Sequence, residues 1–147
     1  ILVLRAGGPP PPAYRLGEIG GAAQAVRGDR VAETQVFLPR SRITLTVLPE
    51  GEEPAAAPTL KVFVSAGDGP LAPGERVKVL AKDGAFRVQA EAGTLFGAEA
   101  GPKRLWVGLA ADGAALDGAA GLAPAAAREL AGVRWLEVPV DYRLVGP

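Results

Sequence analysis

The side chains that could carry out nucleophilic catalysis are few in this chain. Its two serines are Ser41 and Ser65, and neither lies in a Gly-x-Ser-x-Gly turn. The chain has no cysteine and no histidine, so it lacks a thiol nucleophile and the commonest general base. A Ser-Lys pair is the remaining option, and the spacing of the lysines does not favour it. We therefore expect no catalytic residues and no enzymatic activity.

The sequence also favours neither a metal site nor a cofactor. The glutamates between Glu50 and Glu53 lie beside prolines in a polar loop, where carboxylates are usually solvated. Two Asp-Gly pairs, at Asp112 and Asp117, loosely resemble a calcium loop, but the EF-hand spacing is absent and Asp-Gly favours turns. No glycine-rich phosphate loop is present. We expect no metal and no cofactor.

A partner surface is the remaining kind of site that single residues suggest. An aromatic residue on an open strand face marks a contact surface, whereas one on a buried face anchors the core. Trp106 fits the core. Trp135 lies where the apolar alternation of the last strand changes phase, so its face is not fixed by the pattern. Arg40 and Arg42 form a small basic pair, and the alternative is that their side chains are simply solvated. The candidate partner surface comprises Trp135, Tyr142, Arg40 and Arg42.

Composition limits the classes of partner. Lys and Arg total 16 in 147 residues, and Asp and Glu also total 16, so the formal net charge is zero. A nucleic-acid-binding domain usually needs a basic excess, so we expect no nucleic-acid partner. The bias towards Ala, Gly, Pro, Val and Arg fits a GC-rich genome, and a hot habitat is the alternative source of this bias.

The stretch from residue 76 to 109 has the clearest structural pattern. Apolar and polar residues alternate on both sides of Asp83-Gly84, which predicts a β-hairpin with one buried face. Leu95-Phe96 then forms an apolar plug between two glycines. The third strand of this stretch is expected to bury Leu105, Val107 and Leu109 on one face and to carry Trp106 on the other.

Further strands are predicted at residues 14–19, 22–26, 36–38, 42–47, 60–64 and 136–144, with the first two joined as a hairpin at Gly20-Gly21. Pro124 and Gly132 delimit a short helix at 124–131. Pro139 cannot donate to a ladder, so the last strand should lie at a sheet edge or carry a bulge. The sequence shows no alternation of strands and helices of the βαβ type, so we do not expect a parallel sheet. The sum is an all-β fold, an antiparallel immunoglobulin-like β-sandwich of about eight strands, forming one domain over residues 13–147.

Residues 1–12 are expected to lie outside this domain. Four consecutive prolines after Arg5 favour a stiff polyproline spacer. Two readings of the apolar start, Ile1 to Leu4, stay open: the trimmed end of a membrane anchor, or a short first strand.

Three groups of residues together resemble a known bacterial family. They are Phe37, Pro39, Ser41, Arg42 and Ile43; Asp83, Gly84, Arg87 and Val88; and Leu95, Phe96 and Trp106. In this order they resemble the extracytoplasmic domain of membrane-anchored regulators of the anti-sigma-factor type, and similar segments accompany CHAT-type peptidase domains. The likeness covers roughly residues 14–112. The chain contains neither a sigma-binding helical domain nor peptidase residues, so the resemblance implies the outer module alone.

The resemblance implies a non-catalytic binding or sensory module on the periplasmic or extracytoplasmic side of a membrane-anchored regulator. Its partner would be a protein or another ligand of the cell envelope. The alternative is a structural or adhesive envelope domain that self-associates, as a homodimer, through the edge of its last strand.

Overall fold

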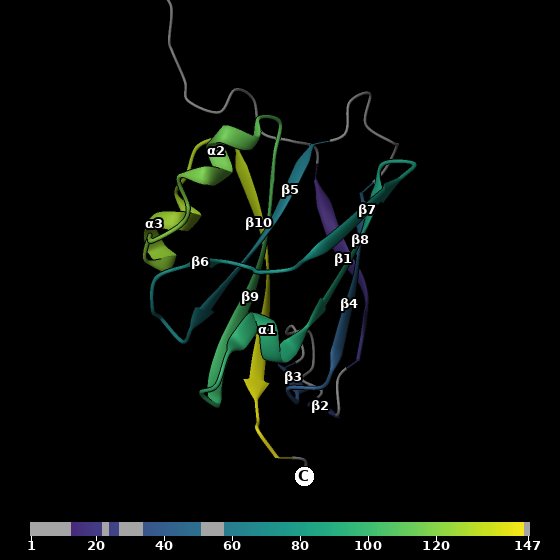
Figure 1. Cartoon of the computed structure of the whole chain (residues 1–147). Helices are drawn as coiled ribbons and strands as arrows, with labels where there is room; N and C mark the ends of the chain where they lie inside the picture. The colour runs from purple at the N-terminus through teal and green to yellow at the C-terminus, as the bar shows by residue number, and fades with distance from the viewer. Residues whose placement is uncertain (1–12, 22–23, 27–33, 51–57, 146–147) are drawn as a thin grey trace, which may run out of the picture.

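The computed structural model describes residues 13–21, 24–26, 34–50 and 58–145, which form an all-β sandwich of two sheets (Figure 1). The four-stranded sheet has the order β1 (Tyr14–Gly20), β4 (Arg42–Pro49), β8 (Ala85–Glu91) and β7 (Lys78–Lys82). The six-stranded sheet has the order β2 (Gln24–Val26), β3 (Thr34–Phe37), β10 (Val133–Tyr142), β9 (Gly101–Ala110), β5 (Thr59–Ala66) and β6 (Ala72–Pro73). The predicted fold class is confirmed, while the immunoglobulin-like connectivity stays a prediction. Residues 1–12, with both readings of the apolar start, lie outside the described residues.

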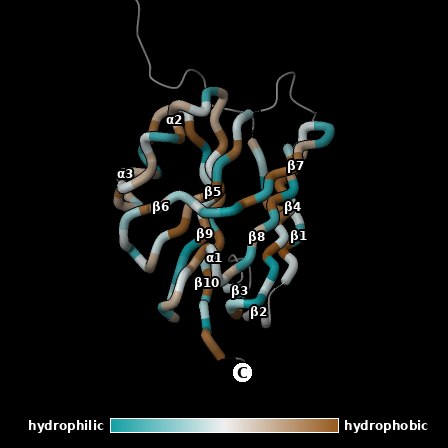
Figure 2. The backbone as a smooth tube through the Cα atoms, viewed as in Figure 1, coloured by the Kyte–Doolittle hydropathy of each residue, from teal (hydrophilic) through white to brown (hydrophobic). Residues whose placement is uncertain are grey.

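The main core lies between the two sheets and draws on both. Ile43, Leu45 and Val47 are buried on β4, while the alternating threonines remain partly exposed. From β9, Leu105 and Val107 enter the same cluster. In Figure 2 brown and paler segments alternate along the strands, as expected when each strand buries one face.

A second, smaller core covers the outer face of the six-stranded sheet. Trp106 is fully buried there and packs with Phe63 and Leu71. Two short helices, α2 (Gly113–Asp117) and α3 (Pro124–Arg128), lie over this face (Figure 1). The predicted helix begins at Pro124 as expected but ends at Arg128, three residues early. β9 is therefore buried on both faces, which explains why large apolar residues occupy both of its sides.

The apolar plug is part of a third short helix, α1 (Ala92–Phe96), which the sequence analysis does not predict. Leu95 and Phe96 are both buried, and the Phe96 ring lies 5.2 Å from the ring of Tyr142. Gly97 ends the helix with a φ of 79°, a conformation that favours glycine.

The hairpin at Asp83-Gly84 is confirmed. β7 pairs with β8 from Lys82–Ala85 to Lys78–Gln89, and both turn residues have positive φ, 52° and 81°, as a type I′ turn requires. The structure differs in one respect: all five residues of β7 are exposed, because β7 is the last strand of its sheet.

Two predicted pairings are wrong. β1 and β2 do not form a hairpin, because β1 belongs to the four-stranded sheet and β2 to the six-stranded sheet. Gly21, with a φ of 92°, lies so close to the carbonyl of Arg42 that a Cβ there would be only 2.0 Å from its oxygen. The chain therefore passes tightly by β4 on its way between the sheets. In addition, β3 and β10 form a parallel pair, whereas the sequence predicts only antiparallel pairing because it lacks a βαβ pattern.

The prediction that Pro139 places the last strand at an edge is also wrong for the strand as a whole. β10 lies inside its sheet and pairs with β9 over all ten residues without a bulge. β3, however, pairs only with Val140 to Tyr142. Pro139 precedes this ladder, so its missing N–H leaves both ladders intact.

Candidate functional site

The two serine hydroxyls take part in structural hydrogen bonds. Ser65 is 4% exposed, and its Oγ accepts a 2.9 Å hydrogen bond from the indole Nε1 of Trp106. The Oγ of Ser41 accepts from the backbone N–H of Leu38 at 3.0 Å. Both hydroxyls thus hold neighbouring parts of the fold in place.

The Asp-Gly pairs also have structural positions. The carboxylate of Asp112 accepts a 2.9 Å hydrogen bond from the backbone N–H of Ala114 and so caps α2. Asp117, at the end of α2, forms an ion pair with Lys61 of β5. Among the described residues, no cluster of Asp and Glu has the arrangement of a metal site, and no helix is long and apolar enough to cross a membrane.

A charged network covers the second core. Glu137 accepts hydrogen bonds from Arg104 at 2.7 Å and from Arg128 at 2.8 and 2.9 Å. The Arg128 guanidinium lies 5.0 Å from the centre of the Trp106 ring. The hydrogen bond from Arg128 lowers the pKa of Glu137, and the bond from Arg104 adds to it, although burial opposes the shift. Because Glu137 is already paired with Arg104 and Arg128, this network stabilises the cover of the second core and is not a candidate binding site.

The two aromatic residues of the candidate partner surface face inwards. Tyr142 is 1% exposed, and its hydroxyl donates to the carbonyl of Gly97 at 2.8 Å. Trp135 is half-buried, its ring lies edge-on to Trp106 at 5.6 Å, and its Nε1 donates to the carbonyl of Ala127 at 2.8 Å. The structure therefore removes Tyr142 from the candidate surface and makes Trp135 a packing residue beneath α3.

The two arginines of the candidate surface are both exposed. Arg40 lies in the turn before β4, where the N–H of Ser41 bonds to the carbonyl of Leu38. Arg42 is the first residue of β4 and lies opposite Glu91 of β8. Its side chain is on the outer face of the four-stranded sheet, because the next residue, Ile43, points into the core.

That outer face collects cations from all four strands. The strand pairings place five of them on it, and we call this surface the basic face: Arg15, Arg42, Lys78, Lys82 and Arg87. Glu91 occupies an outward ladder position opposite Arg42, and Glu18, exposed in the bulge of β1, is a second acidic residue of this sheet. Arg76 borders the face, since it lines one hollow together with Arg42 and Lys78. Within the described part of the chain, none of the five cations forms an ion pair.

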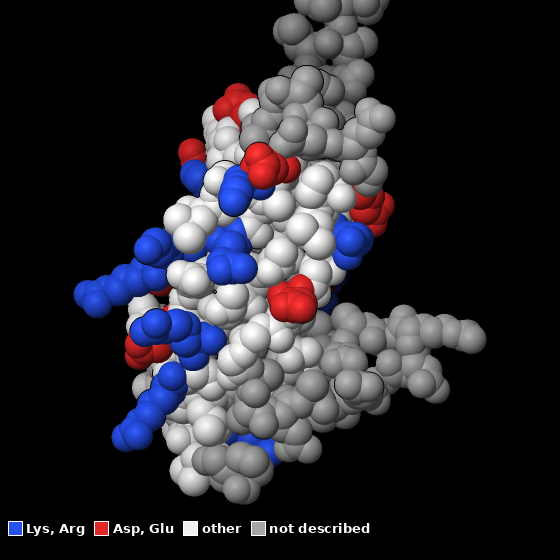
Figure 3. Space-filling view, turned by 90° about the vertical axis from the view of Figure 1, so that its right-hand side faces the viewer, with Lys and Arg blue, Asp and Glu red and all other residues white. Residues whose placement is uncertain are grey.

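Uncharged polar residues separate the cations on the two central strands of the basic face. Thr44, Thr46 and Gln89 point outwards between the cations. Figure 3 looks onto this side of the molecule: most of the Lys and Arg side chains gather at the left, and the middle is mostly white with one acidic residue within it. None of the described aromatic residues is exposed, so this face has no ring on which a base or a sugar could stack.

Sequence reasoning found one residue of this face, Arg42, and missed the other four. Alternation around Asp83-Gly84 does place Lys78 and Arg87 on the solvent side of a hairpin. Arg15 and Arg42 join them only because β4 lies between β1 and β8. That strand order has no signal in the spacing of residues along the chain.

Comparisons with protein-family models, with curated proteins and with solved structures gave no match to this chain.

Proposed function

We propose that this chain is a non-catalytic binding module that docks an acidic surface of a partner protein on its basic face. One observation carries the proposal: five cations that form no ion pair with any described residue gather on one sheet face, in a chain whose net charge is zero. Charge gathered on one surface raises the rate and the specificity of association with a complementary surface.

The chemistry of the face favours a protein over a nucleic acid. Proteins that bind single strands use exposed aromatic rings, and the described aromatic residues are all buried or half-buried. Outward-facing Thr44, Thr46 and Gln89 offer both hydrogen-bond donors and acceptors, which suits a mixed protein surface.

The cellular setting is part of the same proposal and rests on the resemblance to extracytoplasmic domains of membrane-anchored regulators. A reporter enzyme that is active only outside the cytoplasm, fused after residue 147 in the natural gene, tests this setting. Reporter activity in the cytoplasm alone would contradict it.

The binding test uses a fluorescent poly-L-glutamate probe and fluorescence anisotropy. We expect Arg42→Gln and Arg87→Gln each to weaken binding about two- to fivefold, as loss of an exposed ion pair predicts. Binding should also weaken steeply between low and high salt, because exposed charges are screened.

The matched control is Lys103→Gln, which removes the same charge from β9 of the six-stranded sheet. It should leave binding unchanged. Equal losses from all three variants would mean that overall charge, and not this face, attracts the probe. A duplex DNA of similar charge that competes better than poly-L-glutamate would overturn the choice of a protein partner.

A further inference from the structure

β7 is an edge strand of the sheet that carries the basic face. β7 pairs with β8 on one side, and no described strand pairs with its other side. In an antiparallel hairpin the residues that flank a two-residue turn bond to each other, and the pattern then alternates. Starting from Lys82 and Ala85, this alternation points the N–H and C=O groups of Val79 and Ala81 away from β8. Two donors and two acceptors are therefore free to pair with an incoming chain.

This edge has few of the features that block pairing. It is regular over five residues, contains no proline, and exposes Val79 and Leu80 by 38% and 47%. Edges that merely avoid aggregation are usually short, interrupted by a bulge or by proline, or carry charged side chains, and β7 has Lys78 and Lys82 but neither a bulge nor a proline. Leu80 lies between Lys78 and Lys82 on the outer face, and Val79 lies on the opposite face, so an added strand would bury apolar surface on both sides.

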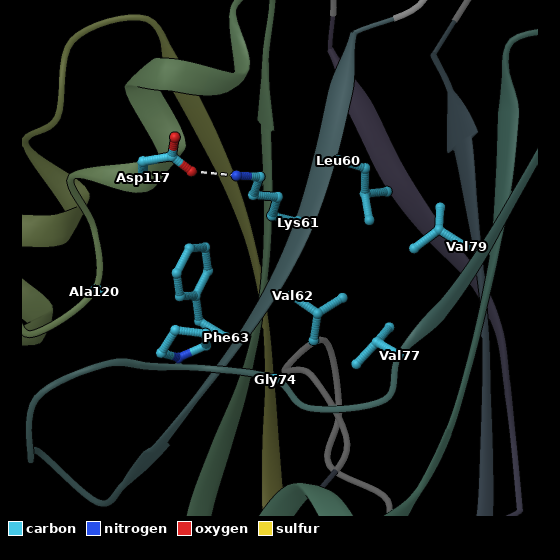
Figure 4. A pocket seen from close by; sticks show the side chains of 10 residues that line it. Leu60, Lys61, Val62, Phe63, Gly74, Val77, Val79, Asp117 and Ala120 are labelled. Carbon is cyan, nitrogen blue, oxygen red and sulfur yellow. Dashed lines mark hydrogen bonds and ion pairs between the residues drawn. The ribbon is translucent and has the colours of Figure 1, made fainter.

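A pocket of about 270 Å³ lies beside this edge, between β7 and β5. Figure 4 shows Leu60 and Val62 of β5 facing Val77 and Val79 across it, with the Lys61–Asp117 ion pair at one border. β6 pairs only with Phe63 and Val64 of β5, and the N–H of Gly74 bonds to the carbonyl of Val62, so among the described residues the edge of β5 is open only before Val62. A strand added to β7 would turn every second side chain towards this pocket and its walls of Leu60, Val62 and Val79.

The positive charges of Lys78 and Lys82 favour an acidic segment as the strand that pairs with β7. On the outer side of β7, Lys78 and Lys82 lie four residues apart, or about 13 Å along a strand. An acidic side chain on the incoming strand can lie opposite each of them. A second copy of β7, paired antiparallel about Leu80, would instead place Lys78 opposite Lys82, and like charges opposite each other destabilise a sheet.

We propose that the open edge of β7 binds an extended segment of a partner protein as a fifth strand, with apolar side chains towards the pocket and acidic side chains towards Lys78 and Lys82. Strand addition of this kind takes its affinity from backbone hydrogen bonds and its specificity from alternate side chains. This inference rests on the proposed function, since it names the part of the acidic partner that the basic face recognises.

The probe is a capped peptide, Glu-Val-Thr-Val-Glu, in which the two valines face the pocket and bond to Val79 and Ala81. We expect the peptide to protect the amides of Val79 and Ala81 from hydrogen exchange. Methylating the backbone nitrogens of both valines should weaken binding about tenfold or more, since two hydrogen bonds are lost. The matched control carries one methyl on the threonine nitrogen, which faces away from β7, and should bind within about threefold of the parent.

Ala81→Pro provides the same test from the protein side. It removes an outward N–H without removing a bond to β8, and proline is tolerated at such edge positions. We expect it to abolish peptide binding, whereas Ala81→Ser should retain it, and thermal unfolding shows whether both variants fold. If Ala81→Pro is unfolded, the methylated peptides decide alone.

The outcomes separate this inference from the proposed function. Binding of poly-L-glutamate that depends on Arg42 and Arg87, together with equal affinity for both methylated peptides, would overturn strand addition and leave the basic face standing. Protection of Val79 and Ala81 without any dependence on Arg42 or Arg87 would support strand addition and overturn the basic face. The absence of both signals would overturn both.

Discussion

Glu137 is a residue whose ionisation contributes to the stability of the fold. Its carboxylate accepts hydrogen bonds from Arg128 and Arg104, which lower its pKa in the folded chain. A carboxyl group with a lowered pKa stabilises the fold above its unfolded pKa, about 4.3, and loses this contribution as the pH falls through its folded value.

We therefore expect Glu137→Gln to reduce the free energy of unfolding by about 1 kcal/mol at pH 7, as for partly exposed charged hydrogen bonds. The difference should shrink below pH of about 4.3, because the natural glutamate then becomes protonated too. Urea unfolding between pH 7 and pH 2.5 measures it. Glu129→Gln, at an exposed position, is the control. A difference that stays constant across this range would contradict the assignment.

Tyr142 illustrates the difference between a core residue and a surface residue. Tyr142→Phe removes the hydroxyl that bonds to the carbonyl of Gly97, so we expect a loss of about 1 kcal/mol in unfolding free energy. Binding of poly-L-glutamate should not change. Arg42→Gln should have the opposite profile, with weaker binding and unchanged stability. Weaker binding by folded Tyr142→Phe would return this residue to the partner surface.

At the scale of elements, β9 approaches α2 closely because it carries a glycine. A Cβ at Gly108 would lie 2.6 Å from a methyl of Leu116 and 2.8 Å from the ring of Trp135. We expect Gly108→Ala to lower the unfolding free energy by about 1–3 kcal/mol, as overpacking does. Gly118→Ala is the control, since its φ is −74° and its nearest neighbour lies at 3.9 Å. Equal melting temperatures for the two variants would contradict close packing at β9.

Elements whose signals are local could be predicted from the sequence. The hairpin at Asp83-Gly84 follows from alternation and two residues that accept positive φ. The start of α3 follows from Pro124. α1 could not be predicted, because five residues that include Gly93 have too little periodicity, and the helix forms where Gly93 packs on Pro39.

The partners of each strand could not be predicted, and the candidate site depends on them. Alternation assigns Arg42 and Arg87 to solvent faces, but it does not show that these faces are the same one. The prediction for Tyr142 was wrong in a similar way, because the same alternation fits either side of β10, and α1 covers the side on which its ring lies. Long-range pairing decides both cases.

At the scale of the whole molecule, β7 also bears on self-association. With Lys at both positions 78 and 82, antiparallel pairing of two copies about Leu80 brings like charges together twice. Lys82→Glu would place a glutamate opposite Lys78 of the other copy. We expect this variant to dimerise in a concentration-dependent manner in analytical ultracentrifugation.

The control for this prediction is the double variant Lys78→Glu with Lys82→Glu, which restores like charges with the opposite sign. It should sediment as the natural chain does under the same conditions. Dimerisation of both variants would mean that the charges at these positions do not control pairing at this edge.

The parallel pair of β3 and β10 has a mechanical consequence. The chain enters β3 at one end of the pair and leaves β10 at the other, because the two strands run in the same direction. Tension between these points would act along the strands and load their hydrogen bonds simultaneously. In an antiparallel pair the same two points lie at one end, and the bonds would open one after another. With three residue pairs and the bond from the N–H of Arg143 to the carbonyl of Phe37, this junction is built to resist being pulled apart along its length.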